Sequence, residues 1–152
     1  MEELMSSFNM ENQMSYVSDM TEEEKIIFLK VLVAMSCSDN NFDDEEKAFI
    51  QDIALVFGIK KDKINDIFAP ITDEELIKNV SKIKNRQIAL NLIKEACLLA
   101  NSDGDLSDHE IILIGKIGQA MGIELEKIEQ ISQWVIDRIV WLEQGKIIFE
   151  QV

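Results

Sequence analysis

Two short acidic segments contain the residues whose types and spacing suit metal chemistry. Asp39 and Glu46 follow one apolar stretch, and Asp103 and Glu110 follow another at an offset of 64 residues. Carboxylate oxygens are the ligands that hard divalent cations such as Ca²⁺ and Mg²⁺ prefer. If the two segments face each other, four carboxylates converge on one point. The sequence therefore predicts a divalent-cation site of the Ca²⁺ or Mg²⁺ class at these four residues, and no other cofactor.

A structural interpretation of the same acidic residues is also open. Glu46 and Glu110 each stand three residues after a helix-capping residue, Asp43 or Ser107, which is the spacing of a capping box. Carboxylates at a helix N-terminus also complement the helix dipole, by about 0.3–1 kcal/mol each. Asp39 and Asp103 fit this interpretation less well, because they end the preceding helices. Capping with solvation and cation binding therefore both remain open.

Other site chemistries are excluded by spacing. An EF-hand loop needs glycine at position 6 and glutamate at position 12, but counting from Asp103 these positions hold Asp108 and Ile114. A zinc helix motif needs a second histidine four residues after the first, and His109 is followed there by Leu113. The sequence has no nucleophile–base pair and no phosphate-binding loop, so we expect a protein that is not an enzyme.

The amino-acid composition and net charge of the chain restrict the kinds of molecule that it is expected to bind. The 152 residues suit one domain, and the formal net charge is −14. Nucleic acid and anionic membranes are disfavoured because no cluster of Lys or Arg exists to displace their counterions. No apolar run is long enough to span a bilayer and no secretory signal is evident, so we expect a cytoplasmic protein. Cys37 and Cys97 lie in apolar helical runs, which predicts buried free thiols.

The elements that position the acidic segments repeat along the chain. The 64-residue offset extends through two units, residues 27–68 and 91–132, and pairs Gly58-Ile59 with Gly122-Ile123. A colinear series of matches with the glycines in register indicates an internal duplication. Duplicated units commonly pack about a pseudo-twofold axis, which would bring the two acidic segments together.

The hydrophobic pattern predicts helices throughout. Residues 1–20 form a Met-rich N-terminal helical extension and residues 21–152 form the helical domain, without a linker between them. Capping residues, apolar stripes and terminal glycines predict helices at 22–37, between Asp43 and Gly58, and at 61–68, 73–83, 86–100, 108–121 and 125–143. The predicted fold is all-α, a single-domain bundle of seven or eight helices with an internal pseudo-twofold duplication.

Three features of the C-terminal half carry further expectations. The helix at 108–121 is apolar on most sides, which predicts a central position. Gly115 and Gly118 inside it each cost about 1 kcal/mol relative to alanine, so we expect a close approach by a neighbouring helix over Ala96 and Ala100. Gly145 is expected to end the last helix. The apolar tail, residues 146–152, should then fold back or meet a partner.

The two acidic segments also carry a family resemblance. Each copy has a small residue, Asp, then Gly or Asn, and ends in Glu before a helix that terminates at Gly-Ile. This pattern, spread over residues 22–143, resembles the TerB-like tellurite-resistance superfamily, which is similar to the N-terminal part of a membrane-anchored DnaJ-type co-chaperone. The resemblance implies an all-helical pseudo-twofold bundle, a metal-binding acidic site at Asp39, Glu46, Asp103 and Glu110, and a role in stress response or as a sensory or interaction module. The first copy departs from the pattern, since Asn40 stands in place of glycine.

Two functions follow as expectations. The first is a non-enzymatic TerB-like module that binds a divalent cation, a protein partner or both. The second is a purely structural interaction domain, self-associating through the Met-rich N-terminus and the edge formed by Trp134 and Trp141. A metal-dependent enzyme is the least favoured interpretation, because paired carboxylates do acid–base work only in a pocket that perturbs their pKa values.

Overall fold

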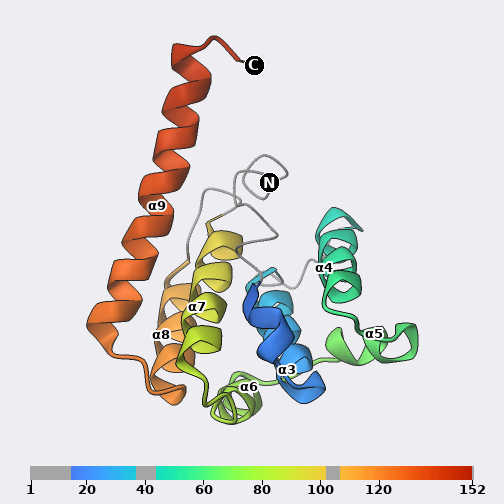
Figure 1. Cartoon of the computed structure of the whole chain (residues 1–152). Helices are drawn as coiled ribbons and strands as arrows, with labels where there is room; N and C mark the ends of the chain where they lie inside the picture. The colour runs from blue at the N-terminus through green and yellow to red at the C-terminus, as the bar shows by residue number, and fades with distance from the viewer. Residues whose placement is uncertain (1–14, 37–43, 102–106, 152) are drawn as a thin grey trace.

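The computed structural model describes residues 15–36, 44–101 and 107–151, and these residues form helices and their connections without a strand. Within them the order is a 3₁₀ helix, η1 (Ser15–Asp19), followed by α3 (Glu22–Ser36), α4 (Asp44–Val56), α5 (Lys61–Ile67), α6 (Asp73–Val80), α7 (Arg86–Ala100), α8 (Asp108–Ala120) and α9 (Leu125–Ile148). The helices pack into one bundle, with α9 rising beyond it (Figure 1). The predicted all-α bundle is confirmed.

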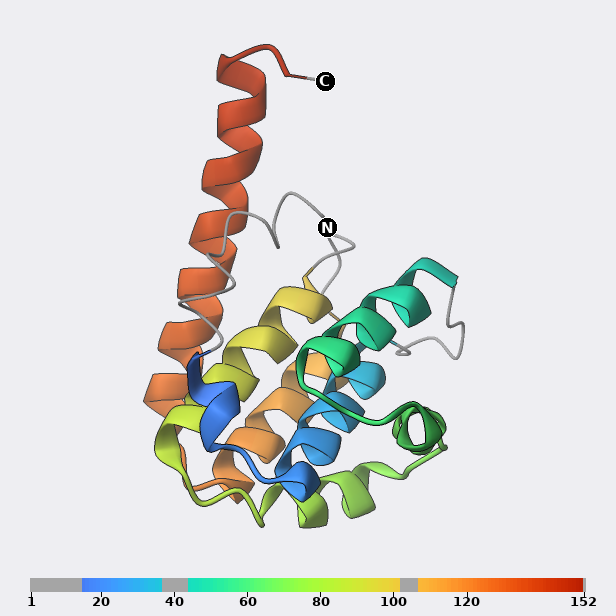
Figure 2. The ribbon, with the colours of Figure 1, turned by 45° about the vertical axis from the view of Figure 1, so that its right-hand side comes forward.

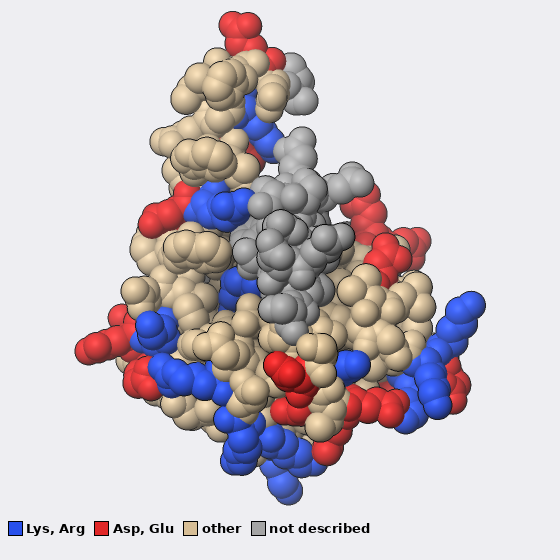
Figure 3. All heavy atoms as spheres, in the orientation of Figure 1, with Lys and Arg blue, Asp and Glu red and all other residues tan. Residues whose placement is uncertain are grey.

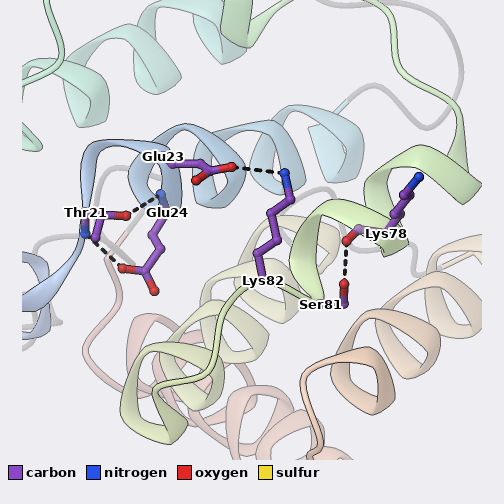
Figure 4. A network of polar contacts seen from close by, with 6 residues as sticks. All are labelled: Thr21, Glu23, Glu24, Lys78, Ser81 and Lys82. Carbon is purple, nitrogen blue, oxygen red and sulfur yellow. Dashed lines mark hydrogen bonds and ion pairs between the residues drawn. The ribbon is translucent and has the colours of Figure 1, made fainter.

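Most helices begin at the residues that the sequence indicates. The Thr21 backbone N–H donates to Glu24 Oε1 at 2.9 Å, and the Glu24 N–H donates to Thr21 Oγ1 at 3.1 Å, which completes the predicted capping box (Figure 4). Thr72 Oγ1 accepts from the Glu75 N–H at 3.1 Å at the start of α6. Asn85 Oδ1 accepts from the second and third N–H groups of α7. These contacts are local, so the sequence is sufficient to predict them.

Helix α6 is shorter than expected. It ends at Val80 rather than at residue 83. The Ser81 hydroxyl donates to the Lys78 carbonyl oxygen at 2.6 Å, a side-chain bond that competes with continuation of the helix. Beside this end, Lys82 Nζ lies 3.0 Å from Glu23 Oε1 of α3 (Figure 4), which ties the two helices together on the surface.

Two helix ends, 64 residues apart, close in the same way. Gly58 and Gly122 have φ values of +77° and +79°. The Ile59 N–H donates to the Ala54 carbonyl at 3.0 Å, and the Ile123 N–H donates to the Gly118 carbonyl at 2.9 Å. This is the bonding of a Schellman turn, whose left-handed residue favours glycine. Both predicted stops are confirmed, whereas the duplication itself stays a prediction.

Helix α7, not α8, is the central helix. All residues from 92 to 100 are buried, and α7 packs against η1, α3, α8 and α9 (Figures 1 and 2). The predicted central position of α8 is wrong, because Ile111 and Ile112 are exposed by 50% and 55%. A helix with apolar residues on most of its faces is therefore not always surrounded by other helices.

The two glycines of α8 differ. A Cβ atom at Gly118 would lie 2.4 Å from Ile128 Cδ1 of α9 and 3.3 Å from Ile93 Cδ1 of α7, so this position does require a close approach. At Gly115 a Cβ atom would meet nothing within 4 Å. The expectation is therefore confirmed at Gly118 and wrong at Gly115, and the close neighbours are isoleucines rather than Ala96 and Ala100.

Helix α9 runs past its predicted end. It continues through Gly145 to Ile148, and the left-handed residue that follows is Glu150, with φ +55°. The expected stop at Gly145 is wrong, since a glycine inside a helix costs only about 1 kcal/mol. We call residues 125–139 the inner part of α9, which packs on the bundle, and residues 140–148 the outer part, which projects from it (Figure 2). The outer part does not fold back.

Candidate functional site

The predicted cation site is described only in part. Glu46 and Glu110 lie in α4 and α8, whereas Asp39 and Asp103 are outside the described residues. Helices α3 and α7 end, and α4 and α8 begin, on the same side of the bundle, the upper side in Figures 1 and 2. Among the described residues, no group of three or more His, Cys, Asp or Glu side chains could hold a metal ion. The four helix ends that border the acidic segments thus lie on one side, and the described residues do not by themselves complete a metal site.

Glu110 has a defined structural role. Glu110 is buried, with only 4% of its surface exposed. The Ser107 hydroxyl donates to Glu110 Oε1 at 2.8 Å, and the Glu110 N–H donates to Ser107 Oγ at 3.2 Å. The predicted capping relationship is therefore confirmed at α8. Glu46 occupies the matching third position of α4 and is half-buried, while its expected partner Asp43 is outside the described residues.

His109 takes part in a surface contact rather than a metal site. Its Nε2 atom lies 2.8 Å from Asp73 Oδ2 at the start of α6, with both side chains more than half exposed. Such an exposed pair contributes little to stability.

A groove between α7 and α9 is the feature that the sequence did not indicate. We call it the α7/α9 groove. It has a volume of about 330 Å³, and it is lined by Leu90, Asn91, Lys94, Lys127, Gln130, Ile131 and Trp134. It therefore combines apolar walls with two lysines. The sequence places lysines on both helices, but only packing brings them to one groove.

Lys94 is a buried cation on this groove. Its side chain is 9% exposed, and its Nζ lies 3.0 Å from Asn91 Oδ1 and 3.3 Å from Glu95 Oε1. The same Nζ lies 6.0 Å from the centre of the Tyr16 ring. Burial raises the pKa of Glu95, and the nearby Lys94 only partly opposes this shift. The adjacent charged residues Lys94 and Glu95, flanked by apolar residues on both sides, are the sequence signal for this feature.

Tyr16 of η1 lies beside Lys94 and Glu95. Burial raises the pKa of its phenol, and the charge of Glu95 adds to the shift. Its hydroxyl has no hydrogen-bond partner within the described part of the chain. Its ring stacks on Phe28, with the centroids 5.8 Å apart. Tyr16 is thus an anchor that fixes the beginning of the described chain beside Lys94.

An apolar stripe continues from the groove along α9. Trp134, Trp141 and Ile148 are seven residues apart, so they share one face of the helix. They are exposed by 48%, 66% and 70%. On the face seen in Figure 3, the projecting part of α9 is largely uncharged. The two tryptophans lie on one edge of the helix, as the sequence predicted.

Cys97 is covered by the inner part of α9. The thiol is free and buried, as predicted. Burial raises its pKa to about 11, against the opposing effect of a hydrogen bond with Ser132 of α9. Cys37 is outside the described residues. A buried thiol with a raised pKa is unreactive, so Cys97 is a packing residue.

The comparisons with known proteins agree with the resemblance found in the sequence. The family model described as tellurite resistance protein TerB matches residues 2–69. That range contains Asp39 and Glu46 and the helices α3 to α5, whereas the α7/α9 groove lies outside it. Neither the comparison with curated proteins nor the comparison with solved structures gave a match. No helix of the described chain is long and apolar enough to cross a membrane. The family match over residues 2–69, together with the all-helical fold, supports a TerB-like assignment.

Proposed function

We propose that this protein is a non-enzymatic TerB-like interaction module that binds a protein partner through the outer part of α9. The observation that carries the proposal is the exposure of large apolar side chains on a projecting helix: Val140, Trp141, Ile147 and Ile148 are 47–79% exposed. Exposed apolar surface on a protein commonly marks a site of interaction with a partner. Tryptophan is also enriched among the residues that dominate binding energy.

The charge of the chain favours a particular kind of partner. With a formal net charge of −14, the protein attracts basic surfaces and repels acidic ones over a range set by salt. In the outer part of α9, Lys146 Nζ lies 3.3 Å from Glu143 Oε1. We therefore expect a partner with an apolar groove bordered by basic residues. The tellurite-resistance description of the family matched over residues 2–69 favours a setting in stress response, and a cytoplasmic location stays a prediction.

Site-specific photo-crosslinking tests this proposal. A photo-reactive phenylalanine analogue replaces Trp141 in one variant and Lys116, an exposed residue of α8, in the matched control. We expect a discrete protein adduct from position 141 in cells, absent from position 116 and lost when Ile148→Asp is added. A band of twice the chain mass would identify a second copy as the partner. Adducts that are the same at both positions, or none at position 141, would contradict the proposal.

A second candidate function is binding of a divalent cation by the two acidic segments. It is supported by the described helix ends that border the two segments, since α3 and α7 end and α4 and α8 begin on one side of the bundle (Figure 1), and by the carboxylate side chains that the sequence supplies at Asp39, Glu46, Asp103 and Glu110. The residues fit a hard cation in chemical type. A carboxylate oxygen that accepts from Ser107 retains a lone pair for a ligand bond.

Isothermal titration of metal-stripped protein with Ca²⁺, Mg²⁺ and Mn²⁺ tests the cation proposal. We expect a saturable heat that is lost in the double variant Asp39→Asn with Asp103→Asn. The matched control removes the same charge from Asp52 and Asp62, two exposed residues of α4 and α5, and should retain the heat. No heat at about 1 mM metal, a concentration that still fills weak sites, or equal heat in both double variants would refute cation binding.

A further inference from the structure

We propose that the α7/α9 groove is covered by the chain's own N-terminal segment, residues 1–14, which lies outside the described residues. This inference is independent of the proposed function, because the groove is bordered by the inner part of α9 and the proposed partner surface is the outer part. Four observations support it: where the segment joins the bundle, which residues line the groove, which residues make up the segment, and how long the segment and the groove are.

The segment joins the bundle beside the groove. Its first described neighbours are Ser15 and Tyr16, and the Tyr16 ring is buried against Phe28. Lys94, which lines the groove, places its Nζ 6.0 Å from the same ring. The residue at which the segment joins the bundle therefore lies next to Lys94, one of the residues that line the groove. A tether of this length gives an effective concentration in the millimolar range, so even weak contacts are occupied.

The groove is apolar and basic. Leu90, Ile131 and Trp134 supply its apolar walls, and Lys94 and Lys127 supply positive charge. Lys94 is neutralised in part by Glu95 at 3.3 Å, whereas Lys127 is a half-buried rim residue. Arg138 follows Trp134 by one helical turn and adds a further basic residue on that side of α9. Such a surface suits a ligand that combines apolar side chains with carboxylates.

The N-terminal segment has that composition. It contains no Lys or Arg, and its acidic residues are Glu2, Glu3 and Glu11. Its large apolar residues are Met1, Leu4, Met5, Phe8, Met10 and Met14. Met1, Leu4, Met5 and Phe8 share one face if the segment is helical. Methionine side chains adapt to irregular grooves because they are unbranched and flexible. The segment and the groove are complementary in both charge and hydrophobicity.

The lengths agree as well. From Lys127 to Trp134 the groove follows seven residues of α9, or about 10 Å of helix. Fourteen residues span about 21 Å when helical and more when extended. The segment is thus long enough to cover the groove from its attachment at Ser15. A segment of a second copy, or an unrelated acidic peptide, would satisfy the same chemistry, and the experiment separates these occupants.

Tryptophan fluorescence tests the inference, because Trp134 lines the groove and Trp141 does not. The chain has two tryptophans, so Trp141→Phe leaves Trp134 as the only reporter. In that background we expect deletion of residues 1–14 to shift the Trp134 emission to the red and to remove its protection from acrylamide. The synthetic peptide of residues 1–14 should restore both. The matched control, Trp134→Phe, reports from Trp141 and should not respond to the deletion.

If the deletion impairs folding, point variants of the full-length chain can weaken the same contact without removing the segment. Lys127→Glu, or Leu4→Asp with Phe8→Asp, should give the same loss of Trp134 protection, whereas Lys116→Glu on α8 should not. Unchanged Trp134 emission in these variants would overturn the inference. Equal changes at Trp141 would also overturn it, because they indicate general loosening. A dimer that becomes monomeric on deletion would overturn the intramolecular assignment in favour of exchange between copies. Crosslinks from position 141 remain a separate readout of the proposed function.

Discussion

The inner and outer parts of α9 belong to one continuous helix and have similar apolar content, yet their environments are opposite. In the inner part, Ile128 and Val135 are buried, and Ile131 and Ile139 pack against the core. In the outer part, Trp141, Ile147 and Ile148 are 66–79% exposed. The difference is not local, since both parts have the same secondary structure. It arises because α7 and α8 lie alongside the first part only (Figure 1).

An apolar stripe in the sequence predicts which face of a helix is hydrophobic, but it does not predict whether other helices of the same chain pack on that face. On the inner part of α9, helices of the same chain pack on the apolar face and contribute to stability. On the outer part, no described helix packs on the apolar face, and we propose that a partner does.

Reactivity of Cys97 should show how firmly the inner part is docked. In a Cys37→Ser variant Cys97 is the only thiol. With a pKa of about 11, only about a thousandth of it is thiolate at pH 8, and the inner part of α9 blocks access. Alkylation by iodoacetamide at pH 8 should therefore be at least a hundredfold slower in the native than in the unfolded protein. Similar native and unfolded rates would mean that the inner part is not held on α7.

Truncation of one isoleucine in each part should separate their contributions to stability. Ile128→Ala removes a buried side chain that contacts α8, and should lower the free energy of unfolding by about 2–5 kcal/mol. Ile148→Ala should change it by less than about 0.5 kcal/mol, because the side chain is exposed. Urea unfolding followed by circular dichroism measures both. Similar losses would show that the outer part packs on the bundle.

The contact between α8 and the inner part can be tested with the paired glycines. Gly118→Ala should destabilise the protein by about 1 kcal/mol, because overpacking against Ile128 outweighs the gain in helix propensity. Gly115→Ala should stabilise it by about 0.5–1 kcal/mol, since nothing lies within 4 Å. Adding Ile128→Val removes the Cδ1 atom that lies 2.4 Å away, so the cost of Gly118→Ala should fall. An unchanged cost would show that the close approach is not the cause.

The smallest effect is expected where α9 begins. Arg86 bonds to both carboxylate oxygens of Glu124, at 2.9 and 2.8 Å. The hydrogen bond from Arg86 lowers the pKa of Glu124. A lowered carboxyl pKa gives stability that is present above the unfolded-state pKa and is lost as the pH falls through the folded-state value. Arg86→Gln should therefore lower the melting temperature slightly at pH 7, with a loss that shrinks towards pH 2 and in high salt. A pH-independent loss would indicate a packing effect instead.

Much of the fold was predictable because its determinants are local. The caps at Thr21, Asn85 and Ser107 and the turns at Gly58 and Gly122 depend on hydrogen bonds within a few residues, and all appear as the sequence indicates. The errors had two origins. The centrality of α8 and the need for a close approach at Gly115 depended on distant neighbours that periodicity does not specify. The expected end of α6 at residue 83 and the expected stop at Gly145 were wrong for local reasons, a side-chain hydrogen bond of Ser81 and the small cost of a glycine inside a helix.

The candidate site divides in the same way. The capping role of Glu110 was predictable from Ser107, three residues earlier. Cation binding at Asp39, Glu46, Asp103 and Glu110 stays a prediction. The α7/α9 groove was not predictable, because Lys94 and Lys127 are 33 residues apart in the sequence and meet only through packing of the two helices.

The sequence by itself determined where helices start, which faces of the helices are apolar, and the resemblance to the TerB family. Backbone capping and side-chain periodicity act over three or four residues, so the order of residues is enough to set them. Only the tertiary structure decided which apolar faces are covered, where a buried lysine meets a groove, and which part of α9 stays in water. Burial depends on what packs alongside each helix, and that is a property of the whole bundle.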